Sequence, residues 1–133
     1  MTNHYPLLAA LAAGLTINVV DVGCTLLFAA KPWEAELRRQ GLEPRPVTPP
    51  YYVITNFIGG LLLAYVFLRF AESLGNSAAT TVKASLVLWL TTRIYGGGHV
   101  VMGQMPPRIF AIMSTGLGTG YLAAGFVFRA LTN

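Results

Sequence analysis

Four long apolar segments constrain the fold of this 133-residue chain more than any other feature of its sequence. A helix needs about 20 mostly apolar residues to cross a bilayer, because the hydrocarbon core is roughly 30 Å thick and each residue adds about 1.5 Å. The segments that meet this requirement cover about 6–30, 51–70, 78–95 and 106–130. The sequence therefore predicts an all-α fold, a four-transmembrane-helix bundle that forms a single integral membrane domain over 1–133.

Composition favours a bilayer as the solvent of this chain. It is 54% hydrophobic and only 11% charged, whereas soluble domains carry about 25% charged residues. A soluble domain this small would lack the charge to cover its surface. The formal net charge of +4 comes from residues placed mainly between the apolar segments, as in membrane proteins. We therefore expect membrane lipids, and no nucleic acid, as partners.

The third segment has its weakest boundary at its end, because Gly96, Gly97 and Gly98 follow Tyr95. We place its end near Tyr95, although the apolar stretch 99–102 would allow the helix to continue beyond a glycine hinge. A three-span alternative would leave one of the four segments lying on the membrane surface.

The polar stretch between the first two segments predicts a short interfacial helix. Pro32 suits the first turn of a helix, arginines occupy the last turn, and Gly41 follows, which matches the preferences of helix ends. Trp33 and Leu37 share one face, so we expect this helix to rest among the lipid headgroups. The proline-rich stretch 43–50 predicts an extended connector.

The distribution of basic residues predicts the orientation. Cytoplasmic loops carry an excess of Lys and Arg. One side of the predicted bundle holds Lys31, Arg38, Arg39, Arg45, Arg93 and Arg108, and the other holds Arg69, Lys83 and Arg129. We therefore expect both termini outside, in a bacterial inner membrane, with the loop 31–50 in the cytoplasm.

Small residues recur at helical spacing in the apolar segments. Within lipid, helices associate through small residues that allow close backbone approach. The fourth segment carries Gly116, Gly120 and Ala124, and the second carries Gly60 and Ala64. These faces predict either packing within the bundle, which we favour, or contact with a partner subunit.

Asp21 lies well inside the first segment and is the most unusual residue of the chain. An acidic side chain at the bilayer centre costs about 2.5–3.5 kcal/mol on insertion scales, so it indicates function or a specific partner. Asp21 and Arg93 each follow the start of their segment by 15 residues, which gives both a depth of about 22 Å. Asn56, on the oppositely directed second segment, reaches the same level, and Asn18 shares a helix face with Asp21.

We therefore predict that Asp21, Arg93 and Asn56 form one hydrogen-bonded layer, with Asn18 beside it. Asp21 and Arg93 would then neutralise each other and fix the helix register. The alternatives are a proton, ion or ligand site, or a protonated Asp21 with Arg93 extended toward the headgroups.

The remaining chemistry of the sequence is sparse. His99 is a candidate axial ligand for a haem or pigment, but an interfacial hydrogen-bonding role is expected more often. Cys24 is the only cysteine, so no all-cysteine metal site is expected. No paired carboxylates, P-loop or catalytic triad can be assembled, so the sequence predicts neither an enzyme nor a metal or cofactor.

The layout resembles a widespread family of small bacterial four-helix membrane proteins that is known only as a domain of unknown function. The resemblance rests on Phe28, Lys31 and Trp33 after the first segment, and on Arg108 and Phe110 before the glycine-rich last one. The chain departs from that pattern where the family carries an aromatic cluster before Phe28. The resemblance implies the four-helix layout and no particular activity.

Two functions follow as hypotheses. The short loops, the small-residue faces and the lack of catalytic groups favour a structural or accessory subunit that packs against other membrane proteins or against copies of itself. The alternative is a small transporter or channel component with a polar pathway at Asp21. A cavity open at Asp21, with Arg93 turned away, would favour the alternative.

Overall fold

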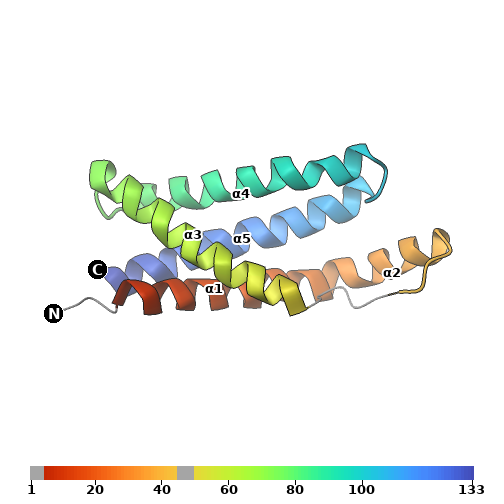
Figure 1. Cartoon of the computed structure of the whole chain (residues 1–133), viewed down its shortest axis with the longest axis horizontal. Coiled ribbons are helices and arrows are strands. Elements are labelled where there is room, and N and C mark those ends of the chain that lie inside the picture. Colours follow the sequence, from red (N-terminus) through yellow and green to blue (C-terminus); the bar gives the residue numbers. More distant parts are fainter. Residues whose placement is uncertain (1–4, 45–49) are drawn as a thin grey trace.

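The computed structural model describes residues 5–44 and 50–133, and every regular element in them is helical (Figure 1). The predicted all-α class is therefore confirmed for this part of the chain. The elements are α1 (Tyr5–Cys24), the π-helical turn η1 (Thr25–Ala29), α2 (Ala30–Arg39), α3 (Pro50–Leu74), α4 (Ala78–Val101) and α5 (Pro107–Thr132).

Three helices of the described chain are long and apolar enough to cross a membrane: Pro6–Arg39, Tyr52–Leu74 and Pro107–Thr132. Helix α4 contains 24 residues, which gives it a length of about 36 Å, but its hydropathy is lowered by charged and hydroxyl side chains such as Lys83 and Arg93. The fourth span therefore stays a prediction.

The predicted end of the third segment at Tyr95 is wrong, because α4 continues through the three glycines to Val101. A glycine inside a helix costs only about 1 kcal/mol, which backbone hydrogen bonds and packing offset. A side chain at Gly96 would contact the ring of Phe110 on α5. The helix stops where Gly103 adopts φ +70°, a left-handed conformation that glycine tolerates best. Similarly, α3 extends past the predicted 70 and ends before Gly75 (φ +71°).

The interfacial helix expected in the first loop is a direct continuation of α1, not a separate helix. The two are joined by η1, where the Ala30 N–H donates to the Thr25 carbonyl oxygen. Pro32 lacks an N–H and its ring clashes with the carbonyl four residues earlier. The wider π-helical turn just before Pro32 accommodates this proline without breaking the helix. As predicted, Gly41 (φ +73°) follows the end of α2.

Helix α1 packs against both α3 and α5. Helix α4 packs against the side of α5 that faces away from α1 (Figure 1). The closest approach joins α1 to α3: a Cβ at Gly60 would lie only 2.5 Å from Gly14 Cα and 2.7 Å from the Ala10 carbonyl oxygen. A side chain at either glycine would force the two backbones apart.

The small residues of α5 face the neighbouring helices. A Cβ at Gly116 would lie 2.8 Å from Cys24 Cβ, and Gly120 lies against Ile17 of α1. Ala124 of α5 and Ala64 of α3 are buried as well. The small-residue faces predicted from the sequence thus lie within the bundle.

Side-chain hydrogen bonds and rings add to the contacts of α5. The Ser85 hydroxyl donates to the Tyr121 carbonyl oxygen at 3.0 Å, and Trp89 Nε1 donates to the Ser114 carbonyl oxygen at 2.7 Å. The rings of Phe67 on α3 and Phe128 on α5 pack edge to face, with centroids 5.4 Å apart. Such polar contacts between helices are worth about 0.6 kcal/mol on average in a membrane protein.

We expect Gly60→Ala to lower the free energy of unfolding in detergent by about 1–3 kcal/mol, the usual cost of overpacking. The added Cβ overlaps backbone atoms of α1, which cannot rotate away. The matched control is Gly97→Ala, because a Cβ there meets nothing within 4 Å. Equal thermal unfolding of the two variants would contradict the close approach of α1 and α3.

Candidate functional site

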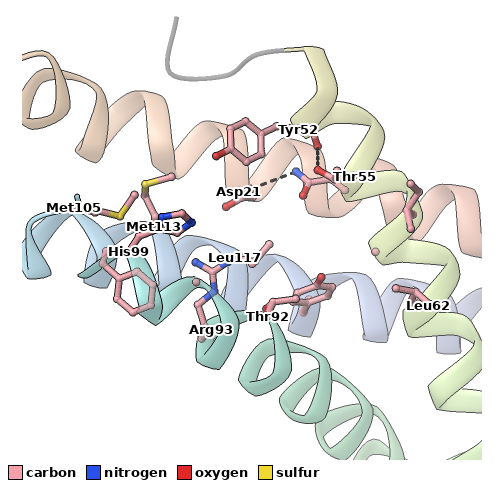
Figure 2. Close-up of a pocket in the computed structure, with 16 residues that line it drawn as sticks. Asp21, Tyr52, Thr55, Leu62, Thr92, Arg93, His99, Met105, Met113 and Leu117 are labelled. Atoms are coloured by element: carbon pink, nitrogen blue, oxygen red, sulfur yellow. Dashed lines mark hydrogen bonds between the residues drawn. The ribbon is translucent and has the colours of Figure 1, made fainter. Parts of the chain in front are cut away.

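A cavity of about 350 Å³ lies between α3, α4 and α5, with one residue of α1 in its wall (Figure 2). Its lining residues place it toward the end of the bundle at which α3 begins and α4 ends. The polar lining is formed by Asp21, Tyr52, Thr55, Asn56, Thr92, Arg93, His99 and Tyr121. The apolar lining includes Ile58, Leu62, Met105, Phe110, Met113 and Leu117.

Three of the predicted polar residues form a connected network between α1 and α3. Asn56 Nδ2 donates to Asn18 Oδ1 at 3.1 Å and to Asp21 Oδ2 at 3.2 Å. Asn18 Nδ2 donates in turn to the Val53 carbonyl oxygen of α3 at 3.2 Å. Asn18 and Asn56 are buried, whereas Asp21 is half-buried and faces the cavity. The network therefore holds a carboxylate in a fixed position at the cavity wall.

The close approach of α1 and α3 explains why these short side chains can meet. Asn18 lies one turn after Gly14 on α1, and Asn56 lies one turn before Gly60 on α3. Because the two helices run in opposite directions and touch at the glycines, these asparagines fall at the same level. Asp21 follows Asn18 by three residues, which places it on the same helix face.

The predicted pairing of Asp21 with Arg93 is wrong. In the described residues the salt bridges join Glu36 to Arg39 and Arg69 to Glu72, and Arg93 forms none. The guanidinium lies over the Phe110 ring, 5.6 Å from its centroid, and its buried Nε has no hydrogen-bond partner. Asp21 and Arg93 lie at similar levels along α1 and α4. However, each of these two helices packs mainly against α3 and α5, so the two side chains are separated sideways.

Asp21 and Arg93 nevertheless face the same cavity from different walls (Figure 2). The arrangement differs from a neutralised buried pair, because space for another molecule lies between the two groups.

His99 lies at the cavity where α4 ends. Its side chain is exposed, and Nδ1 lies 2.8 Å from Gln104 Oε1 in the turn after the helix. Residues 5–44 and 50–133 contain no group of three His, Cys, Asp or Glu side chains placed to hold a metal ion. The structure thus gives His99 a hydrogen-bonding position at the helix end, and the haem or pigment contact stays an untested prediction.

Sequence reasoning missed several residues of the cavity wall. Tyr52 lies one turn before Asn56 on α3, and Thr92 adjoins Arg93, so helical spacing gave a signal for these two. Tyr121 and Phe110 come from α5, whose rotation relative to the other helices follows from packing alone. The Tyr121 hydroxyl lies close to Gly59, where a Cβ would be 3.1 Å from it.

The chain matches no family model, no curated protein and no solved structure. The resemblance to the four-helix family thus stays a prediction. The volume of the cavity falls within the range of small-molecule sites, about 300–1,000 Å³. Its wall combines an apolar surface with a carboxylate, a guanidinium and neutral hydrogen-bonding groups, which suits it to bind a small polar molecule.

We expect Asn56→Leu to lower the free energy of unfolding in detergent by about 0.6–2 kcal/mol. The substitution removes both donors to Asn18 and Asp21 while it keeps a side chain of similar size. Thr91→Val serves as the control, because Thr91 is exposed and its hydroxyl donates only to Val87 of the same helix. If both variants unfold like the parent protein, the network contributes nothing to stability.

Proposed function

We propose that this protein is a small transporter or channel component that binds a polar solute in the cavity beside Asp21. The observation that carries the proposal is a cavity whose walls present an acidic and a basic side chain that form no ion pair with each other. Arg93 faces this cavity and is not turned away from it, so only the first half of the condition set from the sequence is met. Intramembrane charges are costly and are retained where they serve a pathway or a partner.

The proposal includes four membrane crossings, with α4 as the third. The low hydropathy of α4 comes partly from residues that face inward: Thr80, Thr81 and Ser85 are buried, and Arg93 faces the cavity. Its exposed face carries Val82, Leu86, Val87, Leu90 and Ile94. Lys83 lies in the second turn, near enough to the helix end for its side chain to reach the headgroups. Lipid contact would therefore involve a largely apolar surface.

The proposed orientation places the end of the bundle with α2 in the cytoplasm of a bacterial cell. Helix α2 extends past the ends of the other helices (Figure 1). Lys31, Arg38, Arg39 and Arg108 lie at this end, and the positive-inside rule favours it as cytoplasmic. The cavity would then lie toward the cytoplasmic side.

The accessory-subunit hypothesis has less support than the transport hypothesis, which is supported by the cavity. One of its three motivations was the small-residue faces, and Gly60 of α3 and Gly116 and Gly120 of α5 contact α1 within the same chain. Purification of the protein as a stable, monodisperse monomer would argue further against an obligate partner.

Cysteine accessibility tests the number of crossings and the orientation. In a Cys24→Ser background, we expect Asn76→Cys to react with a membrane-impermeant maleimide on intact spheroplasts. Gln40→Cys and Gln104→Cys should react only after permeabilisation. Each crossing places the next loop on the opposite side of the membrane, so both of these positions would lie in the cytoplasm. Labelling of positions 76 and 104 from the same side would contradict a crossing by α4, and labelling of 40 and 104 but not 76 from outside would reverse the orientation.

Proteoliposome uptake tests the transport proposal. The probes are radiolabelled xylitol, choline, sulfate and β-alanine, which are neutral, cationic, anionic and zwitterionic. We expect uptake of at least one probe above empty vesicles and at least a tenfold decrease in Asp21→Asn, because the amide keeps the shape of the carboxylate without its charge. Lys83→Gln, which changes a charge outside the cavity, should leave uptake unchanged. Uptake of no probe would overturn the proposal.

A further inference from the structure

We infer that the molecule bound in the cavity is a zwitterion, with an ammonium group toward Asp21 and an anionic carboxylate or phosphate group toward Arg93. The inference rests on the proposed function, since it names the ligand class of the same cavity. It depends on an acidic and a basic side chain that face one cavity from different helices (Figure 2).

The acidic side of the cavity is preorganised for a cation. Asn56 donates to Asp21 Oδ2, and its orientation is fixed by Asn18, which is itself bonded to the backbone of α3. The hydrogen bonds that position this carboxylate come from neutral amide groups and provide no compensating positive charge. A buried charge without an opposite charge is strongly unfavourable, so an ammonium group placed beside Asp21 would gain both attraction and hydrogen bonds.

The basic side is suited to an anionic oxygen group. The Arg93 guanidinium lines the cavity and forms none of the salt bridges of the described residues, and a partly buried charge without a partner is unfavourable. The Phe110 ring lies against one side of the guanidinium and leaves its planar N–H edge for another group. That edge matches carboxylate and phosphate oxygens, which accept two parallel hydrogen bonds from arginine.

A zwitterion satisfies both sides at once and a singly charged molecule does not. A bound anion would leave Asp21 uncompensated, and a bound cation would do the same to Arg93. A zwitterion also adds no net charge to a site within the membrane, where charge is expensive. The apolar wall, which includes Leu117 between the two groups (Figure 2), can hold the hydrocarbon that joins the ammonium and the anionic group. A free amino acid and the headgroup of phosphatidylethanolamine both have this chemistry.

Calorimetry on the purified full-length protein in detergent tests the inference with β-alanine and two singly charged analogues: propionate, which lacks the ammonium group, and propylamine, which carries a methyl group in place of the carboxylate. We expect β-alanine to bind at least tenfold more tightly than either singly charged analogue. Asp21→Asn should weaken β-alanine to the level of propionate without weakening propionate itself. Arg93→Gln should weaken β-alanine to the level of propylamine without weakening propylamine itself.

A separate lipid-binding experiment distinguishes the two sources of the zwitterion. Native mass spectrometry compares phosphatidylethanolamine with phosphatidylglycerol, which shares the phosphate but has no amine. Preference for phosphatidylethanolamine that Asp21→Asn removes supports the headgroup as the source, whereas tenfold discrimination among the soluble probes alone supports a free solute.

The outcomes separate this inference from the proposed function. Lys83→Gln controls for a change of net charge, and Arg93→Lys, which keeps the charge, covers the case in which Arg93→Gln fails to fold. Binding of propionate or propylamine as tightly as β-alanine, without a preference between the two lipids, would overturn the zwitterion and leave a polar-solute site. Binding of no soluble probe and no lipid would overturn both.

Discussion

The contact between Gly14 and Gly60 is the constraint on which the candidate site depends. It brings the backbones of α1 and α3 so close that a Cβ at Gly60 would overlap the opposite chain. Only at this separation can side chains as short as Asn18 and Asn56 bond directly across the interface, one turn away. The same contact thus supplies packing between the helices and the geometry that holds the carboxylate of Asp21. In lipid, close packing and interhelical hydrogen bonds provide much of the attraction between helices, and this one contact supplies both.

The position of Arg93 gives the cavity its chemical character. Had α4 packed directly beside α1, an ion pair could have formed and filled the space between the two side chains. Instead α5 and α3 each contact both helices, and the guanidinium rests against Phe110. A neutralised pair would have been a structural feature of the bundle. Two separated charged groups at one cavity are less favourable than a neutralised pair. This difference is the physical argument for a bound molecule that pairs with both groups.

Part of this site could be predicted from the sequence and part could not. The depth of each residue along its helix follows from counting, so the shared level of Asp21, Asn56 and Arg93 was accessible, as was the face shared by Asn18 and Asp21. The rotation of each helix was not, so Tyr121 and Phe110 were missed. Local propensity also misled at Gly96, where the helix continues because its backbone bonds outweigh a small intrinsic cost.

The sequence by itself determined that the described residues form helices, that three of these helices are long and apolar enough to cross a membrane, and at what level along its helix each polar residue lies. Those properties depend on residues close together in the chain, through the length and spacing of apolar side chains. The tertiary structure alone decided that α1 contacts α3 at two glycines, that α2 continues α1 through a π-helical turn, and that Arg93 stands apart from Asp21. These outcomes depend on the lateral order and rotation of the helices, which are set by how whole surfaces fit together.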